Sequence, residues 1–302
     1  MKMKKGNKVL KKALAIFIAA SLMVGIAGCG NSKSEEKSIK VGSKDLTENL
    51  IVAEVYALAL EDAGFSVERV MDIAGSVVHT SIMNGEIDLY PEYTGTGLIS
   101  ILKMDPMTDA QQVYDTVKEE YEKQYKLIWL DYSQANDGQG LVIRTDIAEK
   151  YGIKTISDLQ KIASELRFAS QGEFDQREDG MLGLEKLYGP FDWKSSKVYD
   201  GGLKYSVLEN DEADAAPAYT TEGQLVKDEF TLLEDDKKLW PPYNLAPVVR
   251  ETVLNTYPEI ADILNKISAT LDTKTVTKLN AEADVEKREY EEVAKEYYDS
   301  IK

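Results

Sequence analysis

The sequence predicts an α/β protein with two similar lobes around a shared cleft. From residue 39 onward, short apolar segments alternate with amphipathic helical stretches, a pattern typical of parallel strands joined by crossover helices. A fourteen-residue segment that begins at residue 84 is echoed at residue 210. The chain beyond residue 38 is long enough for one large domain or two ordinary lobes, and the repeat favours two lobes.

Periodicity and turn residues place the individual elements. The expected strands lie at 39–42, 66–70, 87–90 and 213–216, and the expected helices at 48–63, 76–84, 108–124 and 284–302. Thr108 or Asp109 is expected to cap its helix, because either side chain can accept a hydrogen bond from the first turn. Ser157 and Gln160 are expected to form a capping box before Ile162. The terminal helix is expected to pack on one lobe.

The internal repeat is the most informative feature. NGEIDLYPEYTGTG at 84–97 aligns without gaps with NDEADAAPAYTTEG at 210–223, at a constant offset of 126. Seven of the fourteen positions are identical: Asn84/Asn210, Glu86/Glu212, Asp88/Asp214, Pro91/Pro217, Tyr93/Tyr219, Thr94/Thr220 and Gly97/Gly223. A weaker echo, at an offset of 127, pairs residues 39–44 with 166–171. One repeat over this distance indicates two similar lobes rather than a solenoid, with chance similarity of a short motif as the alternative.

The repeated tyrosines indicate where a ligand would bind. Tyr93 and Tyr219 each lie just beyond an expected strand. Ligands of open α/β sheets bind beyond the carboxyl ends of the strands. Two lobes that present these tyrosines to one cleft describe a clamshell binding protein.

The first residues have the pattern of a lipoprotein leader. Six lysines precede an apolar run at 13–27, and Gly28 and Cys29 follow it. Residues 26–29, IAGC, resemble the lipobox of bacterial lipoproteins, which implies that Cys29 is lipidated; an ordinary secretory signal with a chance cysteine is the alternative. We expect a signal peptide over 1–28, a polar tether over 29–38, and a lipid-anchored protein on the extracytoplasmic face of the cell membrane.

The charge balance restricts the partners. The formal net charge is −17, and the leader holds six of the 36 basic residues and no acidic residue, so the remainder is more acidic still. Such a surface repels nucleic acid and anionic lipid head groups, and it tolerates a cationic solute. The alternative is that the acidic surface only maintains solubility.

Tyrosine is abundant in a way that suits one class of cation. The chain holds 17 tyrosines and 6 phenylalanines. A quaternary ammonium has no N–H to donate, so aromatic faces hold it through cation–π attraction, and tyrosine offers a more electron-rich face than phenylalanine.

Five segments together carry a resemblance to a known family: GSKDLTEN at 42–49, NGEIDLYPEYTGTG at 84–97, REDGMLGLEKLYG at 177–189, AYTTEGQL at 218–225 and LEDDKKLWPPYNLAPVVR at 233–250. They resemble the substrate-binding lipoproteins of osmoprotectant ABC importers, which take up glycine betaine, choline or carnitine. The resemblance implies the type II periplasmic-binding-protein fold with two hinge strands, lobe I over 39–137 plus 245–302, and lobe II over 138–244. It also implies a monomer that serves an ABC permease and needs no cofactor.

The resemblance assigns the site residues. It places an aromatic cage on Tyr93, Tyr219 and Tyr243, and it places Arg177, Lys44 and Thr96 around the carboxylate of a betaine-like ligand. Arg177 can grip a carboxylate bidentately, or it can form a surface salt bridge with Glu178 or Asp179. Lys44 adds a point charge, or it is a solvated loop lysine. Thr96 lies near a helix start, where backbone N–H groups point outward.

One position departs from the family. Where a fourth cage tyrosine is common, this chain has NDGQG at 136–140, with Gln139 at that position. The cage is then three-sided, with Asp137 or Gln139 contacting the cation or a substrate hydroxyl. Trp240, Tyr132 or Phe174 can compensate by moving in, although Trp240 also fits a packing role between the lobes. An amino acid or another small zwitterion is the alternative ligand.

Enzymatic chemistry lacks its usual groups. His79 is the only histidine and Cys29 the only cysteine. Acyl transfer and zinc hydrolysis need partners that neither residue has in the sequence, so we expect no catalytic residue and no metal site, and a structural or solvent-facing His79.

Overall fold

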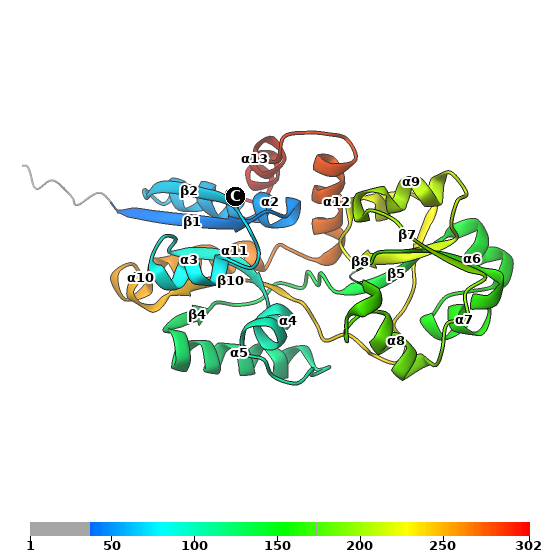
Figure 1. The fold of residues 1–302 in the computed structure, drawn as a ribbon. Coiled ribbons are helices and arrows are strands. Elements are labelled where there is room, and N and C mark those ends of the chain that lie inside the picture. The colour runs from blue at the N-terminus through cyan, green and yellow to red at the C-terminus, as the bar shows by residue number, and fades with distance from the viewer. Residues whose placement is uncertain (1–36, 173) are drawn as a thin grey trace, which may run out of the picture. The chain divides into compact units, whose positions relative to one another are not determined.

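The computed structural model describes residues 37–172 and 174–302, and its strands form two five-stranded sheets. The first sheet contains β1 (Ser38–Lys44), β2 (Ser66–Ile73), β3 (Leu89–Tyr93), β4 (Leu127–Trp129) and β10 (Leu245–Arg250). The second contains β5 (Gln139–Arg144), β6 (Arg167–Ser170), β7 (Ser195–Val198), β8 (Ala215–Tyr219) and β9 (Phe230–Leu232). Helices accompany both sheets, so the predicted α/β class with two lobes is confirmed (Figure 1).

We call each sheet with its helices a lobe. The first lobe holds α2 (Thr47–Asp62), α3 (Val78–Asn84), α4 (Thr94–Thr96), the π-helical turn η1 (Gly97–Ile101), α5 (Ala110–Tyr125), α10 (Glu251–Thr256), α11 (Glu259–Ser268), α12 (Thr273–Asp284) and α13 (Tyr290–Ile301). The second holds α6 (Thr145–Tyr151), α7 (Ile156–Lys161), α8 (Met181–Tyr188) and α9 (Lys204–Glu209), with the 3-10 turns η2 (Ala163–Glu165), η3 (Phe174–Gln176), η4 (Gly201–Leu203) and η5 (Gly223–Val226). The residue limits predicted for lobes I and II stay a prediction.

The two sheets have the same strand order. The first runs β2-β1-β3-β10-β4 and the second β7-β6-β8-β5-β9. In each, the central strand, β3 or β8, pairs in parallel on one side and antiparallel on the other. Tyr93 lies opposite Leu245, and Tyr219 lies opposite Gln139, so the repeated tyrosines occupy matching ends of matching strands. The sequence repeat therefore corresponds to a structural repeat.

The repeated aspartate explains part of this likeness. Asp88 Oδ2 accepts a hydrogen bond from the backbone N–H of Lys40 at 2.9 Å, and Asp214 Oδ2 accepts one from the backbone N–H of Arg167 at 2.7 Å. Each aspartate thus ties the start of the central strand to the neighbouring parallel strand. Because a buried backbone N–H needs a partner, the motif keeps an acceptor there.

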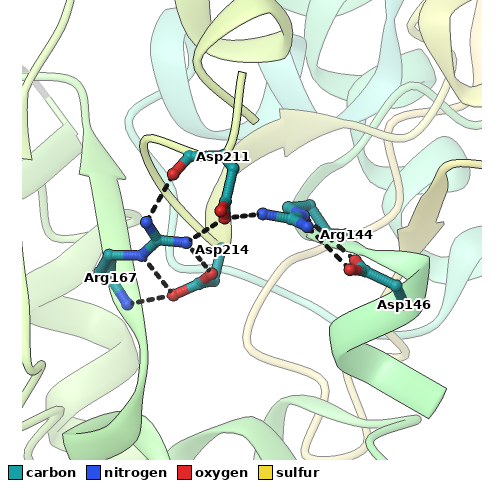
Figure 2. Close-up of polar contacts among 5 residues, drawn as sticks. All are labelled: Arg144, Asp146, Arg167, Asp211 and Asp214. Carbon is teal, nitrogen blue, oxygen red and sulfur yellow. Dashed lines mark hydrogen bonds and ion pairs between the residues drawn. The ribbon is translucent and has the colours of Figure 1, made fainter. Parts of the chain in front are cut away.

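The second lobe extends this tie into an ionic network (Figure 2). The Arg167 guanidinium bonds both carboxylate oxygens of Asp214 and also reaches Asp211. Arg144 bridges from Asp211 to Asp146, with an Nη2–Oδ2 distance of 2.7 Å to Asp146. These charges lie at the edge of the sheet where β8 begins, away from its tyrosine-bearing end.

Each sheet has a core on both faces. In the first lobe, Leu89 packs with residues of α2, α11, α12 and α13, whereas Tyr90 packs with residues of α3, η1 and α5. Neighbouring strand residues point to opposite faces, so one strand supplies both cores. The second lobe divides in the same way, with Ala215 in one cluster and Ala216 in the other.

The chain crosses between the sheets twice, through residues 130–138 and 233–244. The predicted hinge strands are not continuous strands in this part of the described chain. A single antiparallel bridge between Asn136 and Asn244 joins the two crossings. Asn136 also fixes the second crossing by accepting a hydrogen bond from the Tyr243 backbone N–H at 2.6 Å.

Several predicted boundaries shift. The strand predicted at 87–90 is Leu89–Tyr93, and that predicted at 213–216 is Ala215–Tyr219, so both tyrosines end their strands rather than follow them. The capping box predicted at Ser157 and Gln160 is wrong. Thr155 and Asp158 form it instead, because α7 begins at Ile156 and the Ser157 hydroxyl bonds Asp236.

Two other local predictions are confirmed. The Asp109 carboxylate accepts a hydrogen bond from the Gln112 N–H at 2.8 Å and caps α5. The terminal helix is α13, which begins at Tyr290, and it buries Val293 and Tyr298 in the first-lobe core with residues of α2.

Candidate functional site

A cavity of about 430 Å³ is lined by residues from both lobes and from the crossings. All eight residues predicted to bind the ligand line it: Tyr93, Tyr219, Tyr243, Arg177, Lys44, Thr96, Asp137 and Gln139. The two sheets turn the carboxyl ends of β1, β3 and β8 toward this cavity, as the rule for open α/β sheets predicts. The structure therefore gathers the whole predicted set in one place.

The three tyrosines have different surroundings. Tyr93 is 4% exposed, and its hydroxyl donates a hydrogen bond to Glu48 Oε1 at 2.9 Å. Tyr219 is 44% exposed. Tyr243 lies on the second crossing, and a Cβ on Gly95 would come within 2.7 Å of its ring, so only glycine permits this approach. Burial raises the pKa of Tyr243 to about 12, so its phenol stays neutral at physiological pH.

Lys44 is not a solvated loop lysine. Its side chain is 6% exposed and forms a buried ion pair with Glu92. Its Nζ atom also lies 5.0 Å from the centre of the Tyr93 ring. The Lys44 charge is therefore balanced within the protein, and Tyr93, one of the three predicted cage tyrosines, already has a cation beside its ring.

Arg177 forms the salt bridge that was its alternative role. The Arg177 Nε atom donates to Asp179 Oδ1 at 2.7 Å, and the Gln139 side-chain amide donates to Asp179 Oδ2 at 2.7 Å. Burial works against the charged form of Asp179, but the bonds from Arg177 hold the pKa of this carboxyl below its usual value. Arg177, Asp179 and Gln139 thus form one polar wall, in which Gln139 supplies an amide where a fourth aromatic ring was expected.

The structure also shows cavity residues that the sequence analysis missed. Glu48, on the first turn of α2, accepts hydrogen bonds from Tyr93 and from the Asn280 amide, the latter at 3.1 Å. Asn280 also donates to the Thr221 carbonyl at 2.8 Å. Glu48 belongs to the GSKDLTEN motif, whose resemblance to the family pointed to this segment. Asn280 lies in α12, where no motif indicated a role in the site.

Two buried acids in this cavity have altered titration. Burial raises the pKa of Glu48, against the opposing effect of its hydrogen bonds. Burial also raises the pKa of Asp137 well above its usual value, and the Glu48 carboxylate adds to this effect. The Thr221 hydroxyl donates to Asp137 Oδ1 at 2.7 Å. No salt bridge joins Glu48 or Asp137 to a basic side chain among residues 37–172 and 174–302.

The aromatic residues proposed to compensate for Gln139 lie elsewhere. Trp240 packs in the second-lobe core and donates from Nε1 to the Asp179 carbonyl at 2.7 Å, which fits its alternative packing role. Tyr132 lies against Tyr114, with ring centres 4.8 Å apart. Phe174 lines a smaller neighbouring cavity. None of the three lines the main cavity, so its aromatic wall consists of three tyrosines.

His79, the only histidine in the sequence, packs among aromatic side chains. His79 is half-buried and packs edge-on against Tyr121 and Tyr125, and burial lowers its pKa. Within residues 37–172 and 174–302, no cluster of histidine, cysteine, aspartate or glutamate side chains has the arrangement of a metal site. Helices in these same residues are too short or too polar to span a bilayer. Cys29 and the predicted leader lie outside the described residues.

Two matching α/β lobes around a cavity of convergent polar and aromatic groups define a solute-binding protein of the type II periplasmic class. The glycine betaine/carnitine/choline ABC transporter crystal structure resembles this chain with a TM-score of 0.82 and 26% identity, covering 88% of this chain and 98% of that one. The carnitine transport binding protein OpuCC of Listeria monocytogenes is 31% identical over 294 residues, covering 96% of this chain and 93% of that protein.

A third relative is longer. The ergothioneine transport permease/ergothioneine binding protein EgtU of Helicobacter pylori is 31% identical over 290 residues, which cover 95% of this chain and 52% of that protein. This chain thus spans about half of that relative's length. Residues 37–300 match the substrate binding domain of ABC-type glycine betaine transport systems, and the chain belongs to that family. The family consists of binding domains, so the enzyme alternative is set aside.

Proposed function

We propose that this chain captures a quaternary-ammonium osmoprotectant, of the glycine betaine, choline or carnitine type, in the cavity between its lobes. The proposal includes delivery to an ABC permease by a monomer that a lipid on Cys29 holds on the extracytoplasmic face of the membrane. Relatives named for carnitine, glycine betaine and ergothioneine support the ligand class. Incorporation of labelled fatty acid that is lost in Cys29→Ala would test the anchor.

The charge balance of the cavity carries the proposal. Its two basic side chains, Lys44 and Arg177, are each paired with an acid, whereas Glu48 and Asp137 have no basic partner in a salt bridge among the described residues. A cation held against the three tyrosine rings would supply the missing positive charge. Each cation–π contact contributes about 0.5–2 kcal/mol when water is excluded.

A ligand carboxylate has a separate place. Arg177 keeps 44% of its side chain exposed despite its bond to Asp179. It therefore has donors left for a second carboxylate. Thr96 lines the same cavity from the first lobe. We assign Arg177 and Thr96 to the anionic end of a betaine-like ligand, and we assign Lys44 a structural role against Glu92.

A zwitterion with a primary ammonium is the second candidate. Gln139 and Asp137 favour it, because they add hydrogen-bond acceptors to the wall that lacks a fourth ring. A graded series of glycine, dimethylglycine and glycine betaine separates the candidates. Tightest binding of the trimethylated compound supports the first, and tightest binding of glycine supports the second.

Titration calorimetry with glycine betaine, choline and carnitine tests the main proposal. We expect saturable binding of at least one compound with one ligand per chain. Tyr219→Ala should weaken it by about twofold to thirtyfold through the lost cation–π contact. Tyr151→Ala is the matched control, because Tyr151 is similarly exposed at 39% but lies on α6, outside the cavity. Absence of binding for all three compounds at millimolar concentration would contradict the proposal.

A further inference from the structure

Glu48 and Asp137, the two cavity acids to which the proposed function assigns the ligand cation, form an acid pair. Glu48 comes from α2 in the first lobe and Asp137 from the first crossing, and both line the main cavity. Glu48 is 5% exposed. The Thr221 hydroxyl donates a hydrogen bond to Asp137, and the Thr221 carbonyl accepts one from Asn280. Asn280 is also the residue whose amide donates to Glu48. The two carboxyls therefore belong to one hydrogen-bonded cluster.

The surroundings of the pair favour a state of the ligand-free protein in which the two carboxyls share one proton. The titratable and charged groups on the elements around it are Lys44 on β1, Glu92 and Tyr93 on β3, Tyr219 on β8, Glu222 after β8, Tyr243 on the second crossing, Arg177 and Asp179 before α8, and Asp284 on α12. The Lys44 ammonium is engaged by Glu92, and Arg177 is engaged by Asp179. Glu222 is engaged by Lys204.

Like charges that share a desolvated site cannot both ionise at low cost. Burial and mutual repulsion act in the same direction on both groups, and the pKa of Asp137 lies well above its usual value for these reasons. Two such groups titrate as a unit, and the first proton leaves more easily than the second. A fixed positive charge placed beside them reverses the balance.

We propose that Glu48 and Asp137 are specificity-determining residues that retain one proton between them in the ligand-free cavity and release it when a cation binds. This inference rests on the proposed function and adds to it a proton-linked binding step. The proton leaves a carboxyl oxygen for bulk solvent, and the resulting second carboxylate balances the ammonium. Cationic ligands then bind more tightly as the pH rises, and neutral ligands of the same shape show no such dependence.

The test measures proton release directly. The probe is whichever of choline, glycine betaine and carnitine binds the purified chain most tightly. Titration calorimetry at one pH, in two buffers with different ionisation enthalpies, gives the number of protons released. We expect a value approaching one proton, and an affinity that rises by up to about tenfold per pH unit above the ordinary carboxyl pKa of about 4, over the range in which the ligand-free pair retains its proton. Binding that is independent of pH and releases no proton would overturn the inference while leaving the proposed function intact.

Substitutions assign the proton. Glu48→Gln or Asp137→Asn leaves a single carboxyl without its repelling neighbour, so each variant should bind with a flat pH profile and little proton release. Asp236→Asn is the matched control, because Asp236 also accepts a hydrogen bond from a side-chain hydroxyl, that of Ser157 at 2.6 Å, but lies outside the cavity. This control should release as many protons as the wild type.

Two outcomes separate the explanations. Unchanged proton release in both Glu48→Gln and Asp137→Asn would place the proton elsewhere and overturn the inference. If Glu48→Gln fails to fold, Asp137→Asn still decides, because its side chain has a single hydrogen bond to a described residue, Thr221. If none of choline, glycine betaine and carnitine binds the wild-type chain, the proposed function itself is contradicted.

Discussion

Tyr93 and Tyr219 end the central strands of their sheets at matching positions, yet only one of them is buried. Tyr93 is 4% exposed and Tyr219 is 44% exposed. A lysine lies near each ring, Lys44 at 5.0 Å and Lys204 at 5.9 Å, and each lysine pairs with a glutamate. The two lobes therefore share the backbone position of the tyrosine and the lysine–glutamate pair beside it. They differ in the burial of the tyrosine ring.

The difference arises from residues outside the repeat. In the first lobe, the sixteen-residue helix α2 follows β1 directly, packs in the same core as Tyr93 and supplies Glu48. In the second lobe, the corresponding strand β6 leads to the short turn η3 and the eight-residue helix α8. The first lobe thus offers a fixed half-site that excludes solvent, and the second offers a tyrosine that still contacts solvent.

Alanine at the two tyrosines gives the largest expected contrast. Tyr93→Ala should lower the free energy of unfolding by about 3–4 kcal/mol, because it empties a buried aromatic site. Tyr219→Ala should change it by about 0.5 kcal/mol or less, because the ring is exposed. Both variants should bind the ligand weakly. Urea unfolding followed by circular dichroism checks the stabilities, and equal losses in the two variants would break the comparison.

Alanine substitutions of the repeated aspartates, Asp88 and Asp214, should give the next largest difference in stability. Asp214 has 6% of its side chain exposed and is bonded by both Arg167 and the Arg167 backbone N–H, whereas Asp88 is 17% exposed and contacts Arg250 at 3.2 Å. We expect Asp214→Ala to cost about 2–3 kcal/mol, because it leaves buried donors unpaired. Asp88→Ala should cost about 1 kcal/mol. Urea midpoints measure both, and a reversed order would show that the network in Figure 2 contributes little.

The repeated glycines should differ in their effect on ligand binding. A Cβ on Gly97 would lie 2.8 Å from the Trp129 ring, and a Cβ on Gly223 would lie 2.6 Å from the Ala281 backbone nitrogen. Gly97→Ala should cost about 1–3 kcal/mol of stability by overpacking the first-lobe core. Gly223→Ala should also cost stability, because the clash is with backbone atoms, and it should in addition weaken ligand binding, because it separates η5 from α12 and strains the bond from Asn280 to Thr221. Thermal unfolding and calorimetry on both variants check this assignment; a Gly223→Ala variant with wild-type affinity would contradict it.

The smallest expected effect is a decrease at acidic pH in the contribution of Asp214 to the free energy of unfolding. Burial works against ionised Asp214, but its bonds from Arg167 outweigh burial and lower its pKa. A carboxyl with a depressed folded-state pKa contributes stability above its unfolded pKa of about 3.9, and that contribution is lost as the pH falls. The stability difference between wild type and Asp214→Asn should therefore shrink below about pH 4. Unfolding curves across this range measure it, and a constant difference would exclude the ionic contribution.

Much of the fold was predictable because its signals are local or repeated. The alternation of strands and helices gave the class, and the offset of 126 gave two lobes before any three-dimensional information. Boundaries were less accurate, since the capping box at Thr155 competes with an equally suitable pattern two residues later. Two of the three predicted cage tyrosines, Tyr93 and Tyr219, could be placed because they lie at the repeated strand ends, whereas Tyr243 was predicted from the resemblance to the family.

The remaining site residues depend on contacts between distant segments. Asn280 and Glu48 are separated by 232 positions, and no periodicity in either segment indicates their contact. The pairing of Lys44 with Glu92 and of Arg177 with Asp179 likewise decides which charges are free, and sequence alone could not rank these pairs against the many other acids.

The insertion of β10 into the first sheet has a consequence for the order of folding. All strands of the second sheet lie between residues 139 and 232, so that lobe can form from one continuous stretch of chain. The first sheet needs β10 between β3 and β4, and its core also needs α11, α12 and α13. A chain that emerges from its N-terminus therefore begins the first lobe earliest and completes it last. Pulse-labelling hydrogen exchange should show protection in β5, β6 and β8 before β1 and β3, because long-range contacts close late.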